Sequence, residues 1–328
     1  MFNNWINIHD LGRLKDKIRY GEWRQMARKA SSSAPGRTRA AWEHIQGPPV
    51  NAWEIPALRR RWNRMVSGDT AIDHVDYLVG RYLSGRKALK AFSPGCGSGG
   101  NEIRWAETGL FEHIDACDLS SPRIASASAL AEQKNLSGIV KFKVGNMDEI
   151  SGNNLYDLVI TEGALHHFYP MRAALERIKN LLKPGGLLIV DDFAGPSRFQ
   201  WTARQLQAAN AMLALIPAAY RKRWPDGRIK KKIDAPGRLR MKLADPSEAA
   251  ESSLILPLLR EIFTPREIKN KGGTLVCLVF FEIAHHYLQA DETAEQILWL
   301  CFAAEDILMQ SSEISSDYFL GVFQKSPA

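Results

Sequence analysis

The sequence predicts an α/β fold: a doubly wound, mostly parallel sheet of seven strands, with added helices at the N-terminus and in an inserted cap. Three observations predict it. Short apolar runs alternate with helical patterns in the middle of the chain, as in strand and crossover-helix units. A glycine-rich turn, SPGCGSGG, follows the first of these runs. The stretch KPGG then stops a helix and turns the chain into the fifth run.

The elements are expected in the following order. The five core strands are the apolar runs at 88–93, 113–118, 139–144, 156–161 and 186–192. Between them, apolar residues at helical spacing predict helices at 100–108, 122–134 and 170–182. Further helices are expected at 201–215, where Pro217 ends the pattern, and at 246–263, 272–288 and 292–310. The last two strands are expected at 264–271 and 317–325.

This order divides the chain into four segments. Residues 1–80 are expected to form a helical extension or cap, in which an amphipathic helix over residues 1–40 is followed by the flexible joint SSSAPGR. The core is expected at 81–194, a helical and basic insertion at 195–262, and the C-terminal part of the core at 263–328. A chain of 328 residues with 45% hydrophobic content suits one large domain with such additions.

Positive charge is concentrated in two segments. Residues 11–40 carry a net charge of +7 and residues 221–242 carry +8, whereas the whole chain carries +7. Such segments suit an anionic partner, such as a phosphorylated substrate, a nucleic acid, a carrier protein or a membrane surface, and solvated helix faces are the alternative. There is no RNA-binding module, no apolar stretch long enough for a membrane span and no secretory signal, so a cytosolic location is expected. The cysteines form no CxxC pattern, so neither a zinc site nor a disulfide framework is predicted.

The glycine-rich turn and a later acid together predict a nucleoside site. Gly95, Gly97 and Gly99 stand at alternate positions after the first strand, and Asp118 ends the second. A glycine turn lets the backbone approach a ligand closely, and an acid at the end of the second strand can accept hydrogen bonds from both ribose hydroxyls. A tight turn without a ligand is the alternative for the glycines alone.

Five ordered motifs within residues 88–193 resemble those of the class I S-adenosylmethionine-dependent methyltransferases, which have a Rossmann-like fold. They are SPGCGSGG, DACDLS, KFKVGNMDEI, YDLVITEGALHHF and LLKPGGLLIVDDF. The stretches GPSRFQWTARQLQAAN and GGTLVCLVFFEIA are similar to a bacterial subgroup of this family. The resemblance implies S-adenosyl-L-methionine as the cofactor.

The resemblance also implies which residues contact the cofactor. Asp118 would bind the ribose hydroxyls, and Glu162 would meet the methionine amino group. The family usually has an acid at Ser93 and often at Asn146; Glu102 could supply the missing charge, with a solvated helix residue as the alternative. The full set of implied cofactor contacts is Ser93, Gly95, Cys96, Gly97, Asp118, Leu119, Asn146, Met147 and Glu162.

The candidate catalytic residues follow the fourth strand. His166 and His167 stand at the edge where acceptors enter in this family, and either could take a proton from a hydroxyl or a protonated amine. His167 is slightly favoured, and a packed histidine with backbone partners is the alternative for each. Asp191 and Asp192 would orient an acceptor or basic group, or cap the next turn. No metal site is predicted, and the second pair at 285–286 is expected to pack or face solvent.

The predicted activity is methyl transfer to an oxygen or nitrogen of a small molecule, such as a secondary metabolite or a saccharide intermediate. Methylation of RNA or protein, and a non-catalytic cofactor-binding protein, are the alternatives. The Asn-Pro-Pro-aromatic signature of nucleic-acid amino methylation is absent after the fourth strand, where EGALHHF stands. Apolar walls of the acceptor site are expected from Trp53, Trp62, Phe199, Trp201 and Tyr220.

Overall fold

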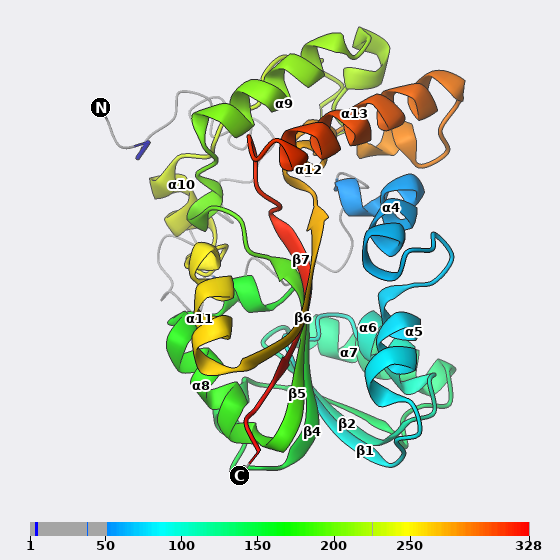
Figure 1. Ribbon diagram of the computed structural model, residues 1–328, viewed down its shortest axis with the longest axis vertical. Helices are drawn as coiled ribbons and strands as arrows, with labels where there is room; N and C mark the ends of the chain where they lie inside the picture. The colour runs from blue at the N-terminus through cyan, green and yellow to red at the C-terminus, as the bar shows by residue number, and fades with distance from the viewer. Residues whose placement is uncertain (1–3, 6–37, 39–50, 225, 328) are drawn as a thin grey trace.

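The fold is a seven-stranded sheet with helices on both faces, seen in a computed structural model that describes residues 4–5, 38, 51–224 and 226–327 (Figure 1). The strand order is β3-β2-β1-β4-β5-β7-β6. β7 runs antiparallel to β5 and β6, and the other neighbouring strands are parallel. The predicted fold class is therefore confirmed. The strands are β1 (Leu89–Pro94), β2 (Phe111–Asp118), β3 (Val140–Val144), β4 (Tyr156–Glu162), β5 (Leu182–Phe193), β6 (Thr264–Gly272) and β7 (Tyr318–Gln324).

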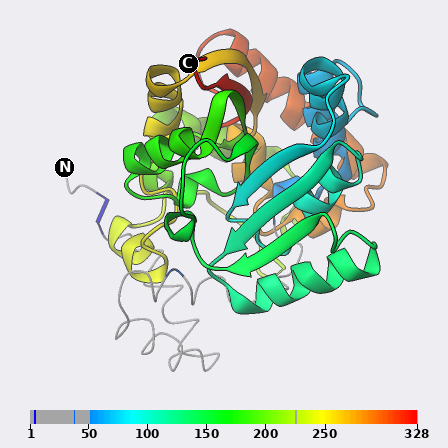
Figure 2. The ribbon, with the colours of Figure 1, turned by 90° about the horizontal axis from the view of Figure 1, so that it is seen from below.

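The central strands are apolar on both sides because each face of the sheet is covered. In β5, Leu187 and Ile189 pack on one face and Leu188 and Val190 on the other. Helices α5 (His74–Leu78), α6 (Gly100–Ala106) and α7 (Ser121–Gln133) lie on the first side, and α8 (Met171–Leu181) and α11 (Ile255–Ile262) on the second (Figures 1 and 2). Continuous apolar runs are the pattern expected of such doubly covered strands.

The remaining helices build a cap beyond the carboxyl ends of the strands. Helices α9, α12 and α13 pack on one another at the top of Figure 1 around an apolar cluster of their own, separate from the two clusters on the sheet. α4 contacts β6. The helices of this cap region are α4 (Pro56–Ser67), α9 (Ala203–Leu215), α10 (Arg238–Ala244), α12 (Thr274–Phe280) and α13 (Glu292–Gln310).

Two of these helices begin at side chains that cap them. The Thr202 side chain accepts a hydrogen bond from the Gln205 N–H before α9, and the Asp291 side chain accepts one from the Ala294 N–H before α13. Such caps satisfy N–H groups that have no partner within the helix. They explain why both helices start within two residues of their predicted positions.

One predicted helix is broken in the structure. Residues 272–288 were expected to form a single helix, but α12 ends at Phe280, the backbone of Phe281 is not helical, and a short 3-10 turn (Ala284–Tyr287) follows. The buried Lys230 ammonium donates hydrogen bonds to three carbonyl groups at this helix end, those of Leu278, Val279 and Phe281. A distant cation thus satisfies carbonyls at the break.

Other helices are shorter than predicted. Of the stretch 246–263 only α11 is a regular α-helix, preceded by a 3-10 turn (Ser252–Leu254). The N-terminal helix expected over residues 1–40 lies almost wholly outside the described residues. The division into four segments stays a prediction. None of the helices in the described part of the chain has the length and hydropathy of a bilayer-spanning segment.

Candidate active site

The residues predicted to hold the cofactor gather at one edge of the sheet. The glycine turn follows β1, Asp118 ends β2, Asn146 comes shortly after β3 and Glu162 ends β4. Because these four strands are parallel neighbours, their carboxyl ends lie side by side. This is the edge at which ligands bind in open α/β sheets.

The glycine turn is held against the end of β2. Gly95 and Gly97 have φ angles of 78° and 56°, which glycine adopts without strain. The N–H groups of Gly95 and Cys96 donate to the Cys117 carbonyl at 2.7 and 3.1 Å. The Gly97 N–H donates to Asp118 Oδ2 at 3.0 Å. The predicted ribose acid is therefore also the residue that fixes the turn.

The Asp118 carboxylate can accept further hydrogen bonds. Its Oδ1 accepts from the Ser120 N–H at 2.8 Å, and each carboxylate oxygen has a second lone pair available to a hydroxyl group. Leu119 and Met147 are half-buried, and Asn146 is exposed. The Asn146 side chain accepts from the Asp148 N–H, so it also caps the 3-10 turn after β3.

Glu102 is buried beside Ser93. The Ser93 hydroxyl donates to Glu102 Oε1 at 2.6 Å, and Glu102 is only 4% exposed, so the solvated alternative for this residue is wrong. Burial raises the pKa of Glu102 to about 7, with a smaller contribution from the Glu162 and Asp118 carboxylates. Its Oε2 is buried and has no hydrogen-bond partner among the described residues. An unpartnered buried carboxylate oxygen suits a cationic amine such as that of the predicted cofactor.

Glu162 lies between this edge and the cap. Its Oε1 accepts a hydrogen bond from the Trp105 indole N–H at 2.7 Å and lies 3.1 Å from His74 Nε2. Burial lowers the pKa of His74, but the Glu162 carboxylate outweighs this effect and the net shift is upward. Glu162 therefore favours the protonated form of His74.

A cavity of about 1870 Å³ lies between these strand ends and the cap. Glu162, both candidate catalytic histidines and the ends of β5 and β6 contribute to it. It is larger than the roughly 300–1,000 Å³ of most ligand pockets. Its aromatic walls include four of the five predicted residues, Trp53, Trp62, Phe199 and Trp201. Tyr220 is not among the lining residues, because its hydroxyl is turned to Asp291, to which it donates at 2.6 Å.

The two candidate catalytic histidines stand in a 3-10 turn (Leu165–His167) directly after β4. Asp192, near the end of β5, contacts His166 Nδ1 and accepts from the N–H groups of Ala164 and Leu165 at 3.0 and 2.6 Å. Asp192 is 2% exposed. It therefore orients a basic group, as one of the sequence alternatives expected, and it also holds the turn after β4, whereas the other alternative concerned the turn after β5. Asp191 instead pairs with the buried Lys271 at 2.6 Å.

The two histidines differ in proton affinity. Burial lowers the pKa of His166, but the Asp192 and Glu248 carboxylates outweigh this, and its pKa is raised. Burial, assisted by His166 and Arg123, lowers the pKa of His167 well below its usual value. The proton therefore prefers His166, although the sequence slightly favoured His167 as the base. Which of them acts in catalysis stays a prediction.

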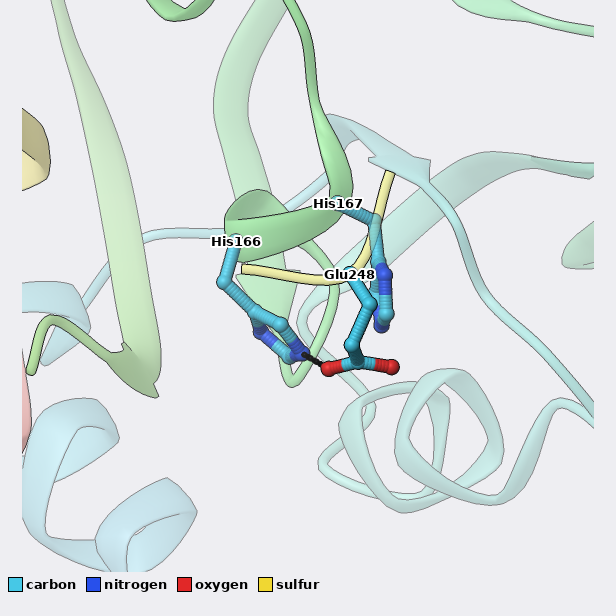
Figure 3. Close-up of side chains that lie close together, drawn as sticks. All are labelled: His166, His167 and Glu248. Carbon is cyan, nitrogen blue, oxygen red and sulfur yellow. Dashed lines mark ion pairs between the residues drawn. The ribbon is translucent and has the colours of Figure 1, made fainter. Parts of the chain in front are cut away.

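Glu248 completes this cluster and was not predicted. It faces both imidazole rings (Figure 3), and its Oε1 lies 3.7 Å from His166 Nε2. Burial raises the pKa of Glu248 to about 7; Asp245 and Asp192 act in the same direction, and His166 acts against them. Glu248 lies in the insertion after β5, where no motif marks it, so only the fold brings it to the histidines.

The basic segment 221–242 contributes to the cavity but does not make it strongly positive. Among the described lining residues there are eight Lys or Arg and nine Asp or Glu. Several cations are paired, as Arg223 is with Asp226 and Glu282. Acidic residues from other parts of the chain therefore balance the positive charge that this segment brings to the cavity. The other basic segment, 11–40, lies outside the described residues except for Thr38.

Comparison with known proteins gives a family match to the middle of the chain. The model of a methyltransferase domain matches residues 86–242. The protein YafE of Escherichia coli (strain K12) is 34% identical over 84 residues, which are 25% of this chain and 40% of that protein. Erythromycin 3''-O-methyltransferase of Saccharopolyspora erythraea is 29% identical over 99 residues, 30% of this chain and 32% of that enzyme. The matched region thus spans well under half of either relative.

The fold agrees with this match. A solved geranyl diphosphate methyltransferase, in complex with GPP and sinefungin, superposes with a TM-score of 0.53 over 89% of this chain and 100% of that chain, at 10% identity. At this identity the likeness concerns the fold alone. The methyltransferase-domain match to residues 86–242 and the seven-stranded sheet both agree with the predicted resemblance to the class I S-adenosylmethionine-dependent methyltransferases.

Proposed function

We propose that the protein transfers the methyl group of S-adenosyl-L-methionine to an oxygen or nitrogen atom of a small molecule held in the cavity. The observation that carries this proposal is the position of Glu162. It ends β4 among the predicted cofactor residues, close enough to Glu102 to affect the pKa of that residue, and it also lines the cavity. A cofactor held at the strand ends would therefore adjoin the acceptor.

The chain's own residues would position the two reactants. The bound cofactor supplies an electrophilic methyl carbon. We assign the ribose to Asp118, the methionine amine to Glu102 and Glu162, and the acceptor to the cavity beside His166 and His167. The acceptor's oxygen or nitrogen would face that carbon, and His166 or His167 would take the proton that it loses. Alignment of the reactants is the main catalytic contribution.

The cavity favours an amphipathic acceptor. Phe199 and Trp201 stack with ring centroids 5.4 Å apart, and the Lys271 ammonium lies 4.3 Å from the Trp62 ring centroid. Aromatic walls with a few placed polar groups suit a secondary metabolite or a saccharide intermediate. The name of the erythromycin O-methyltransferase supports oxygen as the acceptor atom. Methylation of RNA or protein stays an alternative. The cytosolic location stays a prediction.

Two measurements test this proposal. Calorimetry with S-adenosylmethionine should show binding, and incubation of a cell extract with the methyl-labelled cofactor should place the label in the small-molecule fraction. Label in RNA or protein would show that the acceptor is a macromolecule and not a small molecule. Cofactor binding without methyl transfer to any fraction would indicate a non-catalytic protein. Absence of cofactor binding would contradict the proposal as a whole.

A further inference from the structure

The cluster behind this inference consists of His166, His167 and Glu248. Within the part of the chain that the structure describes, it is the one group of at least three His, Cys, Asp or Glu side chains whose ligand atoms all lie within 4.8 Å of one another. Figure 3 shows the two imidazoles and the carboxylate turned toward a common point. The cluster lines the cavity.

The spacing matches that of ligands around one metal ion. Zinc lies about 2.0–2.2 Å from imidazole nitrogen and carboxylate oxygen, so neighbouring ligand atoms of a tetrahedral site are roughly 3.4 Å apart. His166 Nε2 and Glu248 Oε1 are 3.7 Å apart. This pair is too distant for a hydrogen bond of ordinary length, but only a small movement would let both atoms coordinate one ion.

The surroundings of His166 match the outer shell of a metal site. Its Nδ1 is held by Asp192, whose other carboxylate oxygen is fixed by the N–H groups of Ala164 and Leu165. Metal-binding histidines commonly donate their second N–H to a carboxylate in this way, which fixes the tautomer and directs the lone pair at the ion. With Nδ1 protonated, the lone pair of His166 lies on Nε2, the atom nearest Glu248.

We propose that His166, His167 and Glu248 bind a divalent transition-metal ion, Zn²⁺ in preference to Mg²⁺. Two imidazoles and one carboxylate form a donor set that suits zinc, whereas magnesium prefers oxygen ligands and water. Three protein ligands leave a fourth position toward the cavity. If the proposed methyl transfer is correct, on which this last step rests, that position would take the acceptor oxygen and ease loss of its proton to water, since the two imidazoles would then be metal ligands and not bases.

The chain contains a matched control pair. His285 and His286 are also adjacent, with ring centroids 3.9 Å apart and a tilt of 40°, against 4.0 Å and 43° for His166 and His167. The ring N–H of His286 at Nε2 can donate to the Lys222 carbonyl at 2.9 Å. No carboxylate joins this second pair in a metal-type cluster within the described residues.

The test is calorimetric titration of the full chain, stripped with a chelator, with ZnCl₂ alone. We expect about one equivalent to bind with a dissociation constant below about 10 µM, and MgCl₂ to bind more weakly. Glu248→Gln should weaken zinc binding by about 10- to 100-fold, whereas the double variant His285→Ala/His286→Ala should leave it unchanged. Affinity for S-adenosylmethionine, measured in the same variants without metal, verifies that the sheet edge is intact.

The results separate this inference from the proposed function. Absence of zinc binding by a chain that binds S-adenosylmethionine would overturn the metal site alone. Tighter binding of magnesium than of zinc, or loss of zinc binding through the 285–286 variant, would overturn it as well. Failure of the wild-type chain to bind S-adenosylmethionine, with zinc binding retained, would contradict the proposed methyl transfer and leave the metal site standing.

Discussion

At the residue scale, Glu102 is where the structure adds most to the predicted cofactor site. The family usually carries an acid at the position of Ser93, and the short Ser93 hydroxyl instead holds the carboxylate of Glu102 in the buried interior. We propose that this serine and glutamate, nine positions apart in sequence, together take the role of that acid. We infer that Glu102, in α6, supplies the negative charge that this acid supplies in the family.

Cofactor affinity should depend on pH through Glu102. Its pKa of about 7 lies above the usual 4.5, so the carboxyl is mostly protonated at pH 6 and mostly ionised at pH 8. Only the ionised form attracts the cofactor's ammonium group, and affinity for S-adenosylmethionine should therefore rise about tenfold over this interval. Calorimetry at both pH values measures the change. Glu102→Gln should remove the dependence, and Glu107→Gln, an exposed change one turn further on, should retain it.

The same group sets the sign of a stability effect. A carboxyl whose folded pKa is raised stabilises the fold fully below its unfolded pKa of 4.5, and this contribution is lost as the pH rises through about 7. The free energy of unfolding of the cofactor-free protein should fall across that window relative to Glu102→Gln. Urea unfolding measures this free energy at each pH. If it changes with pH in the same way in both proteins, the pKa of Glu102 is not raised by folding.

Asp118 should contribute to cofactor binding through the ribose hydroxyls. Asp118→Asn removes the charge and keeps one acceptor for the Gly97 N–H, and we expect it to weaken S-adenosylhomocysteine binding by about 2 kcal/mol. The loss should shrink sharply for an analogue that lacks the ribose hydroxyls. An equal loss for both ligands would mean that the substitution acts on the glycine turn and not on the ribose.

The residues that sequence reasoning could find are those tied to strand ends. Asp118 and Glu162 were predictable because a strand and its final residue are local patterns. Glu248 was not, because it reaches His166 across an insertion whose path depends on packing. The burial of Glu102 could not be predicted either. A helical pattern does not show that a serine hydroxyl on a neighbouring strand donates a hydrogen bond to the glutamate carboxylate.

At the element scale, Gly99 in the glycine turn occupies a position that tolerates no side chain. Gly99 has a φ of 80°, and an added Cβ would lie 2.7 Å from both Ala127 Cβ and Phe142 Cζ. Gly99→Ala should therefore lower the free energy of unfolding by about 2–4 kcal/mol. Gly100→Ala is the matched control, because a Cβ there meets nothing within 4 Å. Urea unfolding of the two variants measures the difference, and equal stabilities would contradict the steric account.

Strands were easier to predict than helices in this chain. All seven strands were expected within a few residues of their observed bounds. Continuous apolar runs mark the doubly covered central strands, whereas the edge strand β6 has no such run. The predicted helix at 272–288 failed because its end depends on Lys230, which is remote in sequence. Local propensity carries no information about such a partner.

At the scale of the whole molecule, ion pairs of Arg61 join α4 to the C-terminal helix α13 of the cap. Arg61 in α4 pairs with Glu305 in α13 at 3.0 Å, and Glu305, whose side chain is fully buried, also accepts from the N–H groups of Leu275 and Val276 in α12. Three helices far apart in sequence thus meet at one carboxylate. Burial raises the pKa of Glu305, and the Arg61 charge opposes that shift.

Loss of this pair should destabilise the protein strongly. Arg61→Met leaves the Glu305 carboxylate buried without its cation, and we expect a loss of about 3 kcal/mol in the free energy of unfolding. Arg60→Met, on the exposed side of the same helix, should change stability by less than about 0.5 kcal/mol. Chemical denaturation of both variants provides the measurement. A small effect of Arg61→Met would mean that the cap is held by its apolar cluster alone.

The position of β7 between β5 and β6 has a consequence for biosynthesis. β6 is hydrogen-bonded only to β7 in the sheet, so on the ribosome it emerges before the one strand that can receive it. At roughly 5–20 residues per second, β6 waits on the order of a few seconds with both of its edges open. Nascent chains are prone to sticking together during such an interval. A holdase chaperone supplied during translation should therefore raise the yield of correctly assembled protein more than the same chaperone added afterwards.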